Sequence, residues 1–551
     1  MYAEAAATTA AARTTRTECL LLCAGVLAFG CAAAWMGQSN NWDLRNYHWY
    51  DGWAWLSGRS AQDLAAAQAQ TWFNPTLSAL LYLLLSTAPP WLGTFVLGAV
   101  QGLNLLPLHR IAVQLLPPAL LQRRRWLPLL IALVGATGAT QRGELGAGFG
   151  DNLVSLPLLC ALALLLPPQS GRGRIAAAGA LLGLAVGLKL TAAPVASGIV
   201  LAAPLLFAAR GCIPGLAARA RRATALRRWL LLAGYALAGF LLVNGHWMWQ
   251  LWREFGNPLF PLFGSVFGGD FVAPAELRDT RWLPRGALEW LFYPLVWADQ
   301  PRRVSELWFL DLRLPLLFLA LLALPLWRCR ARASLPQPRR LDFVLLAVVL
   351  AYLLWLALFG YYRYLVVLEM LAPLLLVVAL LALPWRIGLA TACAVLVIVG
   401  LATRPPRWGR LAHYGDHYVE VMLPARAQVA NALVVFGSRE PLAFLAPAFP
   451  DSTRFVRIVG NALGPPLPEW ALDRAVYERL HRHDGPLLLL ASDVNETSLQ
   501  EALRRHRLTA TAGACDPVDS NLFDGEMRPQ LCELRTLPPT HTADTVSPAA
   551  Q

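Results

Sequence analysis

Charged and amide side chains interrupt a dense group of aromatics soon after the first apolar stretch. The segment reads Asn41-Trp42-Asp43-Leu44-Arg45-Asn46-Tyr47-His48-Trp49-Tyr50-Asp51. An aromatic belt at a lipid surface explains the rings but not the ionisable residues among them. A carboxyl group that is partly desolvated by neighbouring rings has a raised pKa, which suits a general base. We therefore expect Asp43 to be a catalytic base. The candidate substrate-binding residues beside it are Arg45, Asn46, His48 and Asp51.

A second polar loop, residues 140–152, lies between two apolar stretches. It contains Arg142, Glu144 and Asp151, together with glycines that let the backbone approach a ligand closely. Its GxG pattern is not a dinucleotide fingerprint, because no strand precedes it. Two interpretations stay open: a site formed by the two acids with Arg142 binding substrate, or a flexible hairpin with solvated charges.

A third polar loop spans about residues 250–312 and is rich in charge and tryptophan. This composition is typical of a cap over a cavity that binds a sugar or a lipid headgroup. We expect most of its charges, which include Asp311, Asp270 and Asp299, to be solvated, without assigning any one of these three. Arg281 and Glu306 are its candidate site residues.

Three further ionisable residues lie in or beside apolar stretches: Lys189, Arg363 and Glu369. A charge at membrane depth is a functional hypothesis by default. Lys189 and Arg363 could hold a lipid phosphate near the outer interface. The alternative is that they extend to the lipid headgroups and have no further role.

The composition around these residues excludes a soluble cytosolic enzyme. Of the 551 residues only 15% are charged and 56% are hydrophobic, with mean hydropathy +0.46. A soluble domain carries about 25% charged residues. The net charge of +13 comes from arginines in short runs between apolar stretches, as the positive-inside rule produces, so we expect no nucleic-acid partner.

The hydropathy pattern predicts an α-helical polytopic membrane protein with about eleven transmembrane helices. The predicted spans are 18–37, 91–107, 126–140, 152–168, 175–192, 195–209, 229–249, 313–327, 342–360, 365–384 and 387–403. The arginine runs then all lie on one side, which makes the N-terminus cytoplasmic and the C-terminus external. Residues 75–88 are apolar but short, and we interpret them as a re-entrant or interfacial helix on the outer face. We expect the bacterial inner membrane, with a periplasmic tail.

The composition changes after about residue 403, which divides the chain into a membrane domain, 1–403, and a soluble extracytoplasmic domain, 404–551. Strand-like runs at 433–436, 455–459, 487–490 and 531–534 alternate with helix-like stretches at 470–481 and 498–506. This alternation predicts an α/β domain. Cys515 and Cys532 are the tail's two cysteines and could form a disulfide outside the cytoplasm. The other seven, in or beside spans, fit small apolar filler.

The layout resembles the GT-C superfamily, polytopic glycosyltransferases that use polyprenyl-phosphate sugars. The shared features are an acid after the first span, an interfacial helix, acids in the second outer loop, further spans and an extracytoplasmic tail. The segments that look like bacterial members are Asn41-Trp42-Asp43-Leu44-Arg45-Asn46-Tyr47-His48, Gly183-Leu184-Ala185-Val186-Gly187-Leu188-Lys189-Leu190-Thr191 and Gly360-Tyr361-Tyr362-Arg363-Tyr364. The resemblance covers roughly residues 18–400. It is specific in layout and weak in motif, and it does not extend to the tail.

The resemblance implies inverting transfer of a sugar from a polyprenyl-phosphate donor to an extracytoplasmic hydroxyl. Asp43 matches the superfamily's first-loop catalytic Asp, and Glu144 or Asp151 would match the second-loop acid. In some members that acid helps to hold a divalent metal, here Mg²⁺ or Mn²⁺ at these three acids. The first loop lacks an Asp-x-Asp or Asp-Glu pair, which leaves metal dependence open. The candidates to bind the donor phosphate are Lys189, Arg363 and Arg281.

Other functions compete with this one. A transporter or flippase of lipid-linked glycans should place charges near the membrane midplane and often has internal repeats. The sequence shows no convincing repeat and its acids cluster at the predicted outer face, which favours an enzyme. A polymerase or ligase of lipid-linked glycans would share that outer-face site, and a structural or assembly protein is a further alternative. The sugar and the acceptor, whether glycan, lipid or protein, stay open.

Overall fold

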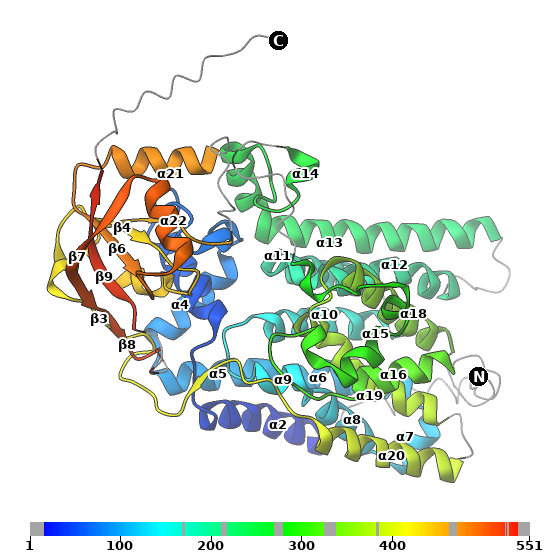
Figure 1. Ribbon diagram of the computed structural model, residues 1–551. Helices are drawn as coiled ribbons and strands as arrows, with labels where there is room; N and C mark the ends of the chain where they lie inside the picture. The colour runs from blue at the N-terminus through cyan, green and yellow to red at the C-terminus, as the bar shows by residue number, and fades with distance from the viewer. Residues whose placement is uncertain are drawn as a thin grey trace. The chain divides into compact units, whose positions relative to one another are not determined.

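The computed structural model describes residues 16–167, 171–210, 218–268, 271, 279–323, 338–381, 385–461, 471–523, 525 and 528–537. The chain forms two compact units (Figure 1). The first, the helical unit, comprises Met1–Leu44, Thr76–Glu254 and Leu277–Tyr418. The second, the sheet unit, comprises Arg45–Pro75, Phe255–Glu276 and Val419–Gln551, so it combines the tail with two segments of the predicted outer loops.

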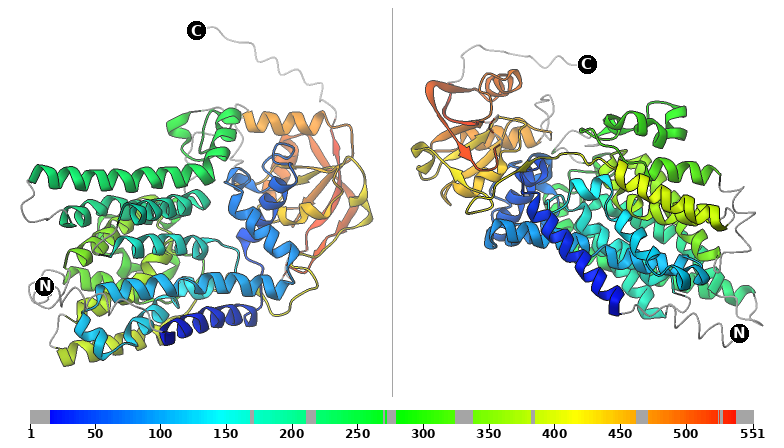
Figure 2. Two further views of the ribbon diagram at one scale, coloured as in Figure 1. Left: turned by 180° about the vertical axis from the view of Figure 1, so that it is seen from behind. Right: turned by 90° about the horizontal axis from the view of Figure 1, so that it is seen from below.

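The helical unit is built from long apolar helices joined by short polar turns. Its helices are α2 Arg16–Trp35, α4 Thr76–Thr87, α5 Pro90–Gly102, α6 Leu105–Leu115, α7 Pro118–Arg123, α8 Leu127–Gly135, α9 Ala139–Gly143, α10 Asp151–Leu165, α11 Arg172–Leu188, α12 Ala193–Arg210, α13 Ala218–Phe255, α15 Ala287–Asp299, α16 Arg313–Leu322, α18 Pro338–Leu358, α19 Val366–Leu380 and α20 Trp385–Ala402. Helix α2 packs on α5, and α12 packs on α18 (Figures 1 and 2). At the first contact a side chain on Gly98 would meet the Phe29 carbonyl at 2.7 Å, so glycine permits the close approach.

The structure confirms a polytopic, mostly helical membrane protein. In the part of the chain that it describes, 6 helices are long and apolar enough to cross a membrane. They are Glu18–Trp35, Pro90–Leu115, Leu190–Ala208, Arg219–Phe255, Pro338–Leu358 and Tyr362–Leu380. Shorter apolar helices are Thr76–Thr87, Asp151–Leu165, Arg313–Leu322 and Ile387–Ala402. The predicted spans coincide with all of these except Thr76–Thr87, and the two others fall on α8 and α11. The number of spans and their orientation stay predictions.

Helix α4 corresponds to the predicted re-entrant or interfacial segment 75–88. It has 12 residues, so it is about 18 Å long. A hydrocarbon core is about 30 Å thick. Its length therefore suits a helix that lies at an interface or enters the membrane partway.

The sheet unit contains the predicted α/β domain. Its strands lie in the order β5-β4-β6-β9-β7. Strand β4 is parallel to β5 and β6, whereas β9 is antiparallel to β6 and β7. The elements are β4 Leu433–Phe436, β5 Arg454–Arg457, α21 Ala471–His481, β6 Leu487–Ala491, α22 Thr497–Arg505, β7 Leu508–Pro517 and β9 Gln530–Thr536. All four predicted strands and both predicted helices are present, while the antiparallel strand β7 was not foreseen.

Two short ladders and the first-loop elements complete the described fold. Strand β1, Gln38–Ser39, pairs with β2, Arg410–Leu411, in the helical unit. Strand β3, Val421–Met422, pairs with β8, Asp519–Ser520, in the sheet unit. The first outer loop forms a π-helical turn η1, Leu44–His48, the helix α3, Trp49–Leu56, and a 3-10 turn η2, Gln68–Trp72.

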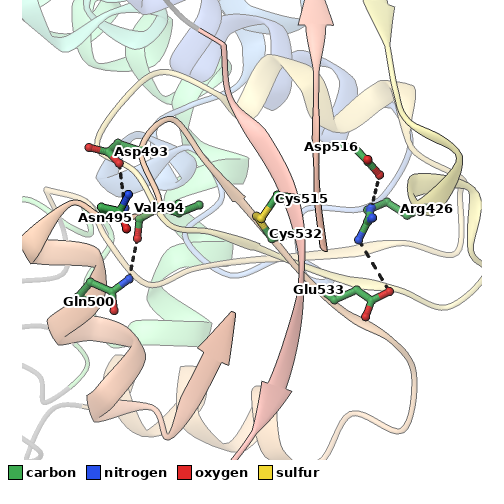
Figure 3. Close-up of a disulfide and its surroundings, with 9 residues drawn as sticks. All are labelled: Arg426, Asp493, Val494, Asn495, Gln500, Cys515, Asp516, Cys532 and Glu533. Carbon is green, nitrogen blue, oxygen red and sulfur yellow. Dashed lines mark hydrogen bonds and ion pairs between the residues drawn. A yellow bond between two sulfur atoms is a disulfide. The ribbon is translucent and has the colours of Figure 1, made fainter. Parts of the chain in front are cut away.

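Cys515 and Cys532 are joined by a disulfide that ties β7 to β9 (Figure 3). The two residues are register partners in these strands, with Cα atoms 4.0 Å apart. Arg426 forms ion pairs with Asp516 and Glu533 on the same two strands. The cysteines of α2, α10 and α20 are free thiols. Cys212 and Cys329 lie outside the described residues.

Candidate active site

Asp43 and Arg363 form the centre of the site, although they lie 320 positions apart in the chain. Asp43 directly precedes η1, and Arg363 lies in the 3-10 turn η6, Tyr362–Leu365, which leads into α19. The Nη2 atom of Arg363 donates to Oδ2 of Asp43 at 2.9 Å. Both groups are nearly buried, so the pair is shielded from solvent. The predicted base and a predicted phosphate-binding cation therefore share one site.

The second loop brings its two acids to the same arginine. The Nε atom of Arg363 lies 3.1 Å from Oδ2 of Asp151 and 3.8 Å from Oε1 of Glu144. Lys189, at the end of α11, places Nζ 2.8 Å from the same Asp151 oxygen. We call these five residues the charged cluster. The structure thus assembles the cluster from the ends of four predicted spans.

Burial distinguishes the three carboxyl groups of the charged cluster. The side chain of Asp43 is 11% exposed to solvent, whereas that of Asp151 is 2% exposed and that of Glu144 is fully buried. Desolvation raises the pKa of Glu144 well above its usual value, and the charge of Asp151 raises it further. Arg363 and Lys189 act in the opposite direction on the pKa of Glu144, so its burial sets it apart from the two aspartates. Asp43 is the carboxylate that a substrate can reach most easily.

Aromatic rings surround the arginine. The guanidinium carbon of Arg363 lies 4.5 Å from the ring centre of Phe149, 5.4 Å from Tyr361, 5.6 Å from Tyr364 and 6.0 Å from Trp408. Ring faces attract a cation, and the attraction is stronger where water is excluded. The sequence analysis did not select Phe149 or Trp408. Phe149 lies in the glycine-rich second loop and Trp408 follows Arg407, and these positions could have indicated that both rings lie near charge.

A narrow pocket opens beside the charged cluster. Its polar end is formed by Asp151, Thr191 and Tyr364, and Thr191 donates to Asp151 at 3.1 Å. Its remaining walls are apolar and consist of Val154, Leu158, Ala192, Val195, Val366 and Val367. The lining is thus polar beside the charged cluster and aliphatic elsewhere.

A second buried network holds the loop that carries Glu144. The N-terminus of α9 donates three backbone hydrogen bonds to carboxylates, from Ala139 to Asp311 and from Thr140 and Gln141 to Glu369. Arg313 pairs with Asp311 at 2.5 Å, and both side chains are fully buried. Asp311 is therefore an exception to the solvated charges expected in the third loop, because it neutralises Arg313 and caps α9. Asp311-Leu312-Arg313 directly before an apolar run was the overlooked signal.

Glu369 is thus an anchor for the second loop. A side chain on Gly138 would lie 1.8 Å from its Oε1 atom, so only glycine allows this contact. Glu369 follows Arg363 on the same turn-and-helix element. The element that supplies the central arginine therefore also fixes the loop bearing two of its acids.

Three other candidate residues of the helical unit lie outside the charged cluster. Arg142 donates to the Thr403 carbonyl at 3.2 Å. Arg281 pairs with Asp279 at 2.6 Å, and its side chain is 76% exposed. Glu306 accepts hydrogen bonds from Tyr361 and from Trp408, two of the rings around Arg363. Of the three, Glu306 is therefore linked to the cluster, through one layer of aromatics.

The remaining first-loop candidates belong to the sheet unit. Asn46 donates to the Ala67 carbonyl at 3.2 Å and accepts from Gln68 at 3.1 Å. The His48 ring lies against that of Tyr47, with ring centres 4.1 Å apart and the planes tilted by 40°. Arg45 lies in η1, and Asp51 lies in the first turn of α3, where burial raises its pKa well above the usual value. Asn46 therefore acts within the first loop itself.

Comparison with known proteins gives two solved structures. No family model and no curated protein matches the chain. The chain is similar to the crystal structure of ArnT from Cupriavidus metallidurans bound to undecaprenyl phosphate, with 14% identity and a TM-score of 0.46. The crystal structure of the same ArnT in the apo state has 13% sequence identity to this chain and a TM-score of 0.47. Each comparison covers 93% of this chain and 97% of the other chain.

The divalent metal that the GT-C resemblance implies does not fit the charged cluster. Arg363 and Lys189 already pair with Asp43 and Asp151 at 2.8–3.1 Å, so these oxygens are occupied by the protein's own cations. Over the described ranges, no group of three or more His, Cys, Asp or Glu side chains is arranged to hold a metal ion. The chemistry proposed below therefore uses the protein's own cations.

Proposed function

We propose that this protein is an inverting membrane glycosyltransferase. It moves a sugar from a polyprenyl-phosphate donor to the hydroxyl of an acceptor outside the cytoplasm. The observation that carries the proposal is the pairing of a partly accessible carboxylate, Asp43, with Arg363. This pair lies next to a second cation, Lys189, and to an aliphatic pocket. A lipid phosphate sugar needs both a cationic and an apolar binding surface.

In the proposed reaction Asp43 acts as general base. It takes the proton of the acceptor hydroxyl while the oxygen attacks the anomeric carbon of the donor. The bond between that carbon and the phosphate oxygen breaks, and the electron pair leaves with the polyprenyl phosphate. This leaving group needs no proton, because a phosphate is ionised at neutral pH. Attack from the face opposite the leaving group inverts the anomeric configuration.

Arg363 and Lys189 stabilise the leaving phosphate. The phosphate gains negative charge as the bond breaks, and preoriented cations in a water-poor site favour that change. Asp151 holds both cations in place, since its Oδ2 atom contacts each of them. The donor phosphate can exchange with carboxylate oxygens at these nitrogens, because both are oxyanions.

We place the protein in the bacterial inner membrane with its N-terminus in the cytoplasm. Arginine runs flank one side of the predicted spans, as positive-inside topology requires. In this orientation the residues of the charged cluster lie at the periplasmic ends of the predicted spans. The sheet unit is then periplasmic too. A disulfide in that unit suits an oxidising compartment.

The test compares wild type with Asp43→Asn and with Asp279→Asn, an acid outside the charged cluster. Each purified protein is assayed in detergent for transfer or hydrolysis with a panel of polyprenyl-phosphate sugars. We expect Asp43→Asn to fold and insert but to lower turnover about 10²- to 10⁴-fold, while the Asp279→Asn control stays active. Equal turnover of all three would remove Asp43 from catalysis. A wild type that translocates the lipids without turnover would instead support the transporter alternative.

A further inference from the structure

The sheet of the sheet unit has an edge strand, β5, that the first outer loop covers. Leu64 and Val456 form a parallel bridge. The amide of Leu64 donates to the Phe455 carbonyl at 2.9 Å, and the amide of Arg457 donates to the Leu64 carbonyl at 3.1 Å. The loop therefore adds a short parallel segment to an edge that would otherwise expose unpaired backbone groups.

A buried aspartate in the loop fixes this segment. Asp63 accepts from the Phe455 amide at 2.9 Å and from the Tyr50 hydroxyl at 2.8 Å. Arg59 approaches the same carboxylate at 3.4 Å and donates to the carbonyls of Asp451 and Thr453. The side chain of Asp63 is fully buried. One residue thus links the loop backbone, helix α3 and the sheet.

The loop also closes the carboxyl end of the parallel strands. Arg457, the fully buried last residue of β5, donates to the Ala66 carbonyl at 2.9 Å and to the Ser438 carbonyl after β4. The side chain of Gln68 accepts from the Asn461 amide at 3.0 Å and donates to the Arg439 carbonyl at 3.0 Å. Open α/β sheets bind ligands at this end. Here the end is occupied by the chain's own first loop.

The same loop begins at the proposed base. The chain runs from Asp43 into η1 and α3 without a break in helical structure. Asn46 on η1 contacts Gln68, and Tyr50 on α3 contacts Asp63. Both attachments therefore lie within two turns of Asp43 along the sequence.

We propose that the sheet unit holds the first outer loop in place for Asp43, and that Asp63 is the principal positioning residue of this attachment. The sheet unit then binds no separate ligand at the carboxyl end of its strands. The strand addition stands without the proposed function, whereas its effect on turnover rests on that function. Asp63 touches no reacting atom and acts through the loop.

Hydrogen exchange of the full-length protein tests the attachment without any substrate. Wild type, Asp63→Ala, Asp63→Asn and Arg426→Ala are compared by mass spectrometry in detergent. Arg426 serves as the control, because it pairs with β7 and β9 away from the first loop. We expect peptides covering residues 62–70 and 44–48 to be protected in wild type and in Arg426→Ala. In Asp63→Ala they should exchange about tenfold faster or more, because a buried donor loses its acceptor.

The conservative variant separates positioning from simple loss of stability. Asp63→Asn retains an oxygen that can accept from Phe455 and should restore most of the protection. With an active donor, Asp63→Ala should lower kcat about tenfold at unchanged KM for the donor, because the donor site is intact while the base is displaced. Unprotected amide hydrogen exchange at residues 62–70 in wild type would overturn the pairing of the first loop with β5. Faster exchange at 62–70 with unchanged exchange at 44–48 would overturn the positioning of Asp43, whether or not any donor is active.

Discussion

Arg363 of the helical unit and Arg457 of the sheet unit satisfy their buried charge in different ways. In the helical unit charge meets charge: Arg363 contacts Asp43 and Asp151, and Arg313 contacts Asp311. In the sheet unit the buried Arg457 donates to backbone carbonyls. Both arrangements compensate the cost of burying a guanidinium, but with partners of different kinds.

This difference indicates what each arginine can do. Carbonyls that belong to fixed backbone cannot leave, so Arg457 joins segments permanently. Carboxylates can be replaced at a cation by another oxyanion such as a phosphate, so Arg363 can exchange its partner for a ligand. Replacing a whole buried ion pair by apolar residues is often neutral or stabilising. A cluster with three acids and two cations is therefore better explained by function than by stability.

The largest expected effect comes from Arg363→Met. This change leaves Asp43 and Asp151 without their shared cation, which should cost about 3–5 kcal/mol of unfolding free energy. It also removes a donor to the leaving phosphate, which should lower kcat about 10²- to 10³-fold. Thermal unfolding and donor turnover measure the two losses. Arg281→Met is the control, because its exposed pair should contribute at most about 1 kcal/mol. A fully active Arg363→Met protein would contradict the assignment.

Arg457→Met should have a smaller effect. It leaves neutral carbonyls unpaired rather than carboxylates, and a buried unsatisfied polar group costs about 1–3 kcal/mol. Burial lowers the pKa of Arg457 to about 9, which still leaves it charged at neutral pH. Chemical unfolding of both variants makes the comparison. If Arg457→Met destabilised the protein more than Arg363→Met, the distinction between carboxylate and carbonyl partners would fail.

The sequence predicted most elements and the main members of the site, but not how they connect. Strands such as 433–436 are short apolar runs bounded by turns, and Asp43, Lys189 and Arg363 each stand out in an apolar setting. The contact between Asp43 and Arg363 joins segments 320 positions apart, which depends on helix packing that no local pattern encodes. For the same reason the capping role of Asp311 and the place of the first loop in the sheet unit were missed.

A pH titration sharpens the electrostatic account of the helical unit. Because folding raises the pKa of Glu144 above its usual 4.5, the folded state retains a proton that the unfolded state loses. The stability contributed by Glu144 is therefore complete below pH 4.5 and declines as pH rises towards the folded pKa. Its share of the slope is at most about 1.4 kcal/mol per pH unit.

Glu144→Gln should remove that share of the slope. Its melting temperature should fall less than that of wild type between about pH 5 and about pH 8. Glu478→Gln, on the exposed face of α21, should follow wild type, since its partner Arg482 is also exposed. If the melting temperatures of wild type and Glu144→Gln changed in parallel with pH, Glu144 would be ionised in the folded protein. The charged cluster would then carry a third carboxylate and could suit a cation.

The smallest expected effect is that of metal removal. A divalent ion at Asp43, Glu144 and Asp151 would have to displace Arg363 and Lys189, which contact the two aspartates at 2.8–3.1 Å. The two cations already supply the positive charge that such an ion provides in phosphate chemistry. We therefore expect turnover to be unchanged by EDTA and by added Mg²⁺ or Mn²⁺. Loss of activity in EDTA with recovery on adding metal would mean that the acids release their cations when the donor binds. In that case Arg363 would contact the donor phosphate and no longer the acids. The Arg363→Met variant would then keep part of its turnover, and that turnover would depend on the metal.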